Sequence, residues 1–155
     1  MCWMCDHPEA TVQEWLDAVR EMVQKHGWAV QFVESDRMAY AYTVGLHERG
    51  LPELLVTGLS PKRATHLLNS VADYLVDGGK PLPGELISIA GGPPLEVVQV
   101  QHPDAHMNVA VALYGPDVRA LQLVWPDDQG RRPWDPAFSN GKARQSVLGV
   151  RVGLT

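Results

Sequence analysis

The two cysteines of the chain are the residues whose type and spacing most directly suggest chemistry. Cys2 and Cys5 are separated by two residues, a spacing that lets two thiolates face one point and hold a soft metal or form a disulfide. Dithiol enzymes usually place such a pair after a strand, at the start of a helix. No strand is predicted before Cys2, which disfavours redox chemistry, and two thiolates supply half of a four-ligand metal site.

His102 and His106 are the candidates for the missing metal ligands. Their spacing would place two imidazoles on one face of a helix, and with the cysteine pair they would complete a Cys2His2 site for zinc or iron. Compact zinc modules keep their ligands within about 15 residues, whereas nearly the whole chain lies between these pairs. The alternatives are two solvated histidines and an N-terminal segment that packs as an apolar plug.

Two further segments collect polar and aromatic residues within otherwise apolar surroundings. Loops on a rigid sheet often carry binding groups, indoles provide flat walls, and a guanidinium can hold a carboxylate or phosphate with paired donors. We therefore expect a small-molecule pocket between the two segments. Each feature also has a purely structural explanation. The first segment could be an ordinary surface loop with tyrosines packed in the core, and the second could be a turn whose tryptophans pack it against the core. The candidate ligand-binding residues are Tyr42, Thr43, His47 and Glu53 in the first segment, and Trp125, Asp127, Arg131 and Trp134 in the second.

Capping signals mark the helices that must position these residues. Thr11 and Glu14 form a capping box before a helix over 12–26, which Gly27 should end. Ser60 and Pro61 begin a second helix, which extends to the glycines at 78 and 79. A third helix is predicted from Pro103 to Tyr114.

The strands are predicted from short runs rich in Val, Ile and aromatic residues. Residues 28–34 and 38–44 form a hairpin, and further strands follow at 54–57, 86–89, 95–101 and 119–125. Hairpins followed by helices, rather than strict β-α-β alternation, predict a single α+β domain with a mostly antiparallel sheet. About three helices should pack on it, and we expect them on one face.

Composition limits the classes of function. The chain of 155 residues carries a formal net charge of −5, which disfavours nucleic-acid binding. No stretch is long and apolar enough for a membrane span, and the first helix follows acidic residues rather than the basic start of a signal peptide. We expect a cytoplasmic protein of one domain over 1–155, with a cysteine-containing N-terminal segment at 1–10 and a polar C-terminal tail at 136–155.

Several runs together resemble the bacterial family DUF4262. They include the opening Cys-x-x-Cys-Asp, the run 41–46 (Ala-Tyr-Thr-Val-Gly-Leu), the Pro-Glu-Leu at 52–54 and the run 122–127 (Gln-Leu-Val-Trp-Pro-Asp). The resemblance spans nearly the whole chain. The resemblance implies a shared fold and a set of shared positions, but it implies no reaction. It also implies that the two N-terminal thiols are family positions rather than a chance pair.

The leading hypothesis is a soluble small-molecule-binding domain in which the cysteine pair supports structure or a metal. One alternative is a metal-assisted or cysteine-dependent enzyme of a small biosynthetic pathway, in which Cys2 or Cys5 works with a histidine. Another is a regulatory module that binds a protein partner, which would require an exposed apolar patch.

Overall fold

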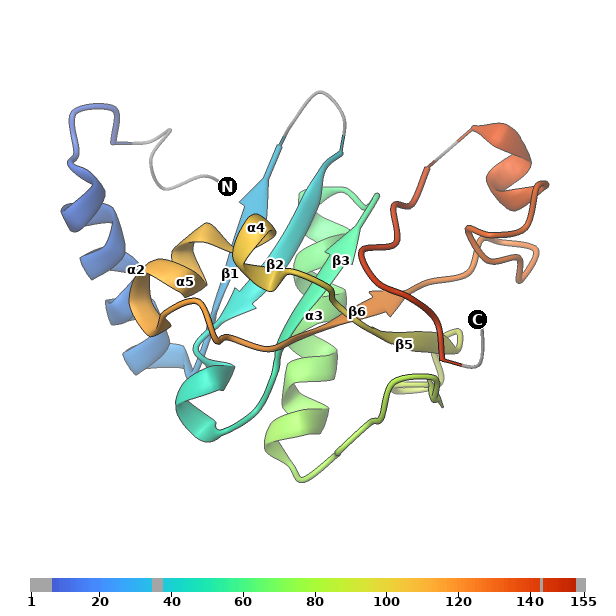
Figure 1. The fold of residues 1–155 in the computed structure, drawn as a ribbon, viewed down its shortest axis with the longest axis horizontal. Coiled ribbons are helices and arrows are strands. Elements are labelled where there is room, and N and C mark those ends of the chain that lie inside the picture. The colour runs from blue at the N-terminus through green and yellow to red at the C-terminus, as the bar shows by residue number, and fades with distance from the viewer. Residues whose placement is uncertain (1–6, 35–37, 143, 153–155) are drawn as a thin grey trace.

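The protein is built on a six-stranded mixed sheet. The computed structural model describes residues 7–34, 38–142 and 144–152. The strands are β1 (Ala29–Val33), β2 (Tyr40–Val44), β3 (Glu53–Thr57), β4 (Leu86–Ile87), β5 (Leu95–Gln99) and β6 (Ala120–Val124), and the order across the sheet is β1-β2-β3-β6-β5-β4 (Figure 1). The predicted α+β class is confirmed.

All strand pairs except one are antiparallel. The predicted hairpin is β1 and β2, with Ala29 opposite Val44. The exception is β3 with β6, which run parallel, with Glu53 beside Ala120 and Leu55 beside Gln122. Both of these central strands are buried along their whole length, as expected for strands that are covered on both faces.

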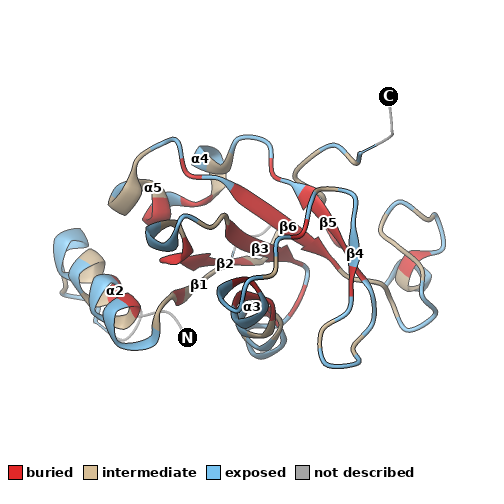
Figure 2. Ribbon diagram, turned by 90° about the horizontal axis from the view of Figure 1, so that it is seen from below, coloured by how far each residue is buried: buried red, intermediate tan, exposed pale blue. Residues whose placement is uncertain are grey.

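Helices cover both faces of the sheet, so the expectation of a single helical face was wrong. Helix α3 (Pro61–Val76) packs on one face together with Leu54 and Val56 of β3. Helices α2 (Val12–His26) and α5 (Asn108–Tyr114) share the other face with Leu55. Figure 2 shows α5 and α3 on opposite sides of the buried strands. Alternate residues of a strand point to opposite faces, so Leu54 and Val56 of β3 face one helical layer and Leu55 faces the other.

The first two long helices begin and end where their caps predict. The Thr11 hydroxyl accepts a hydrogen bond from the Glu14 amide, the Glu14 carboxylate accepts one from the Thr11 amide, and Gly27 ends α2 in the left-handed conformation. Ser60 caps α3, and Pro61 occupies its first turn. These are local signals, which explains why sequence alone located both helices.

The predicted third helix is two short helices, α4 (Pro103–His106) and α5, broken at Met107. The Met107 side chain is fully buried, and its backbone is not helical (φ −110°, ψ 61°). Two tyrosines of β2 bind the polar groups near this break. The Tyr40 hydroxyl donates to the His106 carbonyl (2.7 Å), and the Val109 amide donates to the Tyr42 hydroxyl (3.0 Å).

Much of the polar C-terminal tail is fixed against the sheet by side-chain amides. Gln122 of β6 donates to the Ser146 carbonyl (2.7 Å) and accepts from the Leu148 amide (2.8 Å). Gln145 in turn binds the backbone of Trp125, accepting from its amide (3.0 Å) and donating to its carbonyl (2.8 Å). We call residues 144–149 the C-terminal strap. It fixes the chain just after β6.

Candidate functional site

Glu53 is the centre of a buried network at the start of β3. Its side chain is completely buried, and its two oxygens accept hydrogen bonds from four donors. These are the Thr43 hydroxyl (2.8 Å) and the amides of Gly45 (2.9 Å), Leu46 (3.2 Å) and His47 (3.1 Å). Burial raises the pKa of Glu53, and these hydrogen bonds oppose the rise. The carboxylate thereby caps the short helix η1 (Leu46–Arg49) and shapes the loop before β3.

His47 lies at the edge of this network. Its ring stacks on Tyr114 of α5, with 5.1 Å between the ring centroids, and the Tyr114 hydroxyl donates to the Glu48 carboxylate. Glu53 accepts from the His47 amide, so the imidazole is not its hydrogen-bond partner. Tyr42 is fully buried, and its hydroxyl accepts a hydrogen bond from the Val109 amide. The first segment therefore joins β2, β3, η1 and α5.

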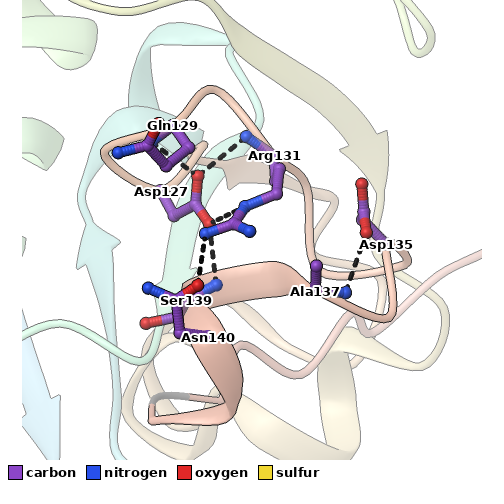
Figure 3. A network of polar contacts seen from close by, with 7 residues as sticks. All are labelled: Asp127, Gln129, Arg131, Asp135, Ala137, Ser139 and Asn140. Carbon is purple, nitrogen blue, oxygen red and sulfur yellow. Dashed lines mark hydrogen bonds and ion pairs between the residues drawn. The ribbon is translucent and has the colours of Figure 1, made fainter.

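Asp127 organises the turn of the second segment in the same way (Figure 3). Its carboxylate accepts from the amides of Gln129, Arg131 and Ser139, and from the Arg131 guanidinium at 2.8 Å. Desolvation alone would raise the pKa of Asp127, but these hydrogen bonds lower it to about 2. Arg131 also donates to the Asn140 side chain. Both charged groups are thus engaged within the turn.

The two tryptophans of the second segment lie in different surroundings. The Trp125 indole donates to the Thr57 carbonyl (2.8 Å) and packs against Phe138, with 5.4 Å between ring centroids. Trp134 is partly exposed and is covered by the Arg151 guanidinium, 3.7 Å from its ring centroid. Arg151 also forms a bidentate ion pair with Glu96.

The structure does not bring the two segments together. Glu53 begins β3 beside the start of β6, whereas Trp125 follows the end of β6 and bonds to Thr57 at the end of β3. The five residues of β3 separate the two groups, which at about 3.3 Å per residue is more than 10 Å. Each segment has its own cavity nearby.

A cavity of about 390 Å³ lies against Trp125, and we call it the Trp125 cavity. Its floor is apolar, and the indole forms part of its wall. It lies between the first two turns of α3, the loop before β5 and the chain that follows β6. The lining residues are Leu59, Lys62, Arg63, His66, Leu67, Pro93, Leu95, Trp125 and Pro126.

Three basic side chains border the Trp125 cavity. Lys62, Arg63 and His66 are exposed on the first two turns of α3, and within the described ranges none of them takes part in an ion pair. Helix N-termini favour acidic residues because of the helix dipole, yet the first turn of α3 contains none. The cavity therefore combines an apolar floor with unneutralised positive charge, an arrangement that suits an organic anion.

These basic residues were missed by the sequence analysis. The signal was present: a Ser-Pro cap followed by Lys62 and Arg63 places cations where acidic residues are favoured. The sequence could not show the rest of the cavity wall, because Pro93 and Trp125 come from segments distant from α3 in the chain. Trp125 alone among the candidate ligand-binding residues lines this cavity.

The metal hypothesis stays a prediction, since Cys2 and Cys5 lie outside the described residues. His102 precedes α4 in the left-handed conformation (φ 56°, ψ 56°), so the two histidines do not share a helical face. The His106 ring lies edge-on to Tyr40, with 6.2 Å between ring centroids. Among the residues with described positions, no cluster of three or more His, Cys, Asp or Glu side chains could hold a metal ion.

In the part of the chain with described structure, no helix has both the length and the apolar character needed to cross a bilayer.

The fold and its cavities define a single α+β domain in which a mixed sheet is covered by helices on both faces. The chain belongs to the family described as "Domain of unknown function (DUF4262)", whose model matches residues 22–139. The matched range contains the Glu53 network and the Trp125 cavity, whereas Cys2, Cys5 and the C-terminal strap lie outside it. No curated protein and no solved structure matches the chain.

Proposed function

We propose that the protein is a small-molecule-binding domain whose ligand occupies the Trp125 cavity. The ligand would combine a flat apolar body, placed against the indole, with a carboxylate or phosphate facing Lys62 and Arg63. The observation that carries the proposal is the convergence on an apolar cavity beside Trp125 of three basic side chains that form no ion pair with any residue of described position.

The rigidity of the cavity wall supports this proposal. The Trp125 indole donates a hydrogen bond to the Thr57 carbonyl, and the Trp125 backbone forms two hydrogen bonds with the Gln145 side chain. A wall that is ordered before binding reduces the entropy that the complex must lose. The cavity volume of about 390 Å³ falls within the range of ordinary ligand pockets.

The electrostatics support an anion. Lys62 and Arg63 lie at the positive end of the α3 dipole, where cations are unfavourable by themselves. An anion in the cavity would offset both their mutual repulsion and their repulsion by the dipole. Among the residues of described position that line the cavity, none is acidic.

Two-dimensional amide NMR tests the proposal with 1-naphthoate as the probe and the uncharged 1-naphthamide as its matched control. We expect naphthoate to shift the amides of Arg63, His66, Leu67 and Leu95, and to bind at least about tenfold more tightly than the amide, since charged hydrogen bonds contribute about 1.5 to 3 kcal/mol. Equal binding of both compounds, or shifts that avoid these residues, would contradict the proposal.

A further inference from the structure

A second cavity, of about 350 Å³, lies at the opposite end of α3 and β6 from the Trp125 cavity. It is bordered by the loop 50–52, the loop 79–83, Leu75 near the end of α3, and residues 119–121 around the start of β6. We call it the proline cavity, because Pro52, Pro81 and Pro83 line it. The two cavities share no lining residue.

The walls of the proline cavity are aliphatic. Leucine and proline side chains provide most of the lining, and no aromatic ring contributes. Proline has no amide N–H, so these walls leave few backbone donors to be desolvated when an alkyl chain covers them. Leu82, which is 64% exposed, offers further apolar surface at this site. The chemistry suits an alkyl chain rather than an aromatic ring.

Two cations, Lys80 and Arg119, line the proline cavity together with the amide side chain of Gln99. Arg119 is held in place by a hydrogen bond from its Nη2 to the Gly50 carbonyl (3.1 Å). Among the residues that the structure describes, no acidic side chain lines the cavity and none forms an ion pair with either cation. Lys80 and Arg119 can therefore both bind an anion in the cavity.

The Glu53 network fixes one wall of this cavity. The Glu53 amide donates to the Arg119 carbonyl (2.9 Å), and the Leu51 amide donates to the Leu46 carbonyl (3.1 Å). The Gly50 amide donates to the His47 carbonyl (3.0 Å). The loop 50–52 is thus tied to the turn that the buried carboxylate caps.

We infer that the proline cavity is a second binding site, which takes an unbranched aliphatic carboxylate. The alkyl chain lies against the leucines and prolines, and the carboxylate faces Arg119 and Lys80. This assignment rests on charge complementarity and on wall chemistry, and it is independent of the ligand proposed for the Trp125 cavity.

Amide NMR titration of the full chain with octanoate tests the inference, with octanamide as the uncharged control. We expect octanoate to shift the amides of Leu51, Gly79, Leu82 and Ala120 and to bind at least about tenfold more tightly than octanamide. Octanoate shifts confined to the Trp125 cavity, or equal affinity for the acid and the amide, would overturn the inference.

A pair of double variants separates this site from the Trp125 cavity. Lys80→Gln/Arg119→Gln should weaken octanoate at least about tenfold and leave naphthoate unchanged, whereas Lys62→Gln/Arg63→Gln should do the reverse. If the Arg119 change perturbs the fold, Lys80→Gln alone should still weaken octanoate selectively. Octanoate affinity that is unchanged in Lys80→Gln/Arg119→Gln would refute the second site without affecting the proposed function.

Discussion

Glu53 is a candidate ligand-binding residue in the sequence, and in the folded protein its carboxylate holds a loop. Its spacing in the sequence could not show that the carboxylate points inward to three amides and a hydroxyl. Asp127 behaves in the same way. At this scale, the sequence shows which polar side chains are present, and the folded structure determines which groups each one binds.

Replacing Glu53 with Gln should destabilise the protein by about 3 kcal/mol, because the amide nitrogen would face buried donors in place of an acceptor. The matched control is Glu48→Gln on the same turn, where the exposed side chain keeps an oxygen that can accept from the Tyr114 hydroxyl, so the change should cost no more than about 0.5 kcal/mol. Urea denaturation measures both. Similar losses for the two variants would show that the buried network is not what stabilises this turn.

Asp127→Asn tests the other carboxylate through pH. The hydrogen bonds lower the pKa of Asp127 in the folded state to about 2, below its value in the unfolded chain, so the charged form adds stability above about pH 4 that is lost as pH falls toward 2. The stability advantage of the wild type over Asp127→Asn should therefore shrink across this range. Thermal denaturation at several pH values measures it, and a constant difference would contradict the account.

Elements with strong local signals were predicted closely, and contacts between distant elements were not. Helix α2 has the predicted bounds because its capping box and terminal glycine are local. The break between α4 and α5 depends on tyrosines of β2, more than 60 residues earlier. The parallel pairing of β3 with β6 and the placement of helices on both faces also depend on long-range packing. No periodicity within one segment encodes them.

The helix break gives an element-scale prediction. Tyr42→Phe leaves the buried Val109 amide without its acceptor and should cost about 2 kcal/mol. Tyr40→Phe removes a hydrogen bond from a less buried side chain and should cost about 1 kcal/mol. Urea denaturation ranks the two, and hydrogen exchange at Val109 should accelerate in Tyr42→Phe alone. A larger loss in Tyr40→Phe would show that the break is stabilised in another way.

Over the whole molecule, α3 lies between two separate cavities. Both are lined by basic side chains, and they differ in the apolar residues of their walls. The sequence predicts one pocket bordered by both candidate segments, whereas the parallel β3 and β6 hold those segments at opposite ends. The Trp125 cavity has an aromatic wall and basic groups from α3. The proline cavity has aliphatic walls and basic groups from the loops around it. The sequence predicts a small-molecule ligand, and the basic groups at each cavity are the reason we propose an organic anion for both.

The most direct test of the central claim is the affinity of 1-naphthoate, measured by calorimetry, for two double variants of equal charge. Lys62→Gln/Arg63→Gln removes the cations beside Trp125, and Arg20→Gln/Lys25→Gln removes two exposed cations of α2, which pair with Asp17 and Glu21. We predict a loss of at least about tenfold in the first variant and no change in the second. Equal affinity in the two variants would contradict a ligand site at the Trp125 cavity.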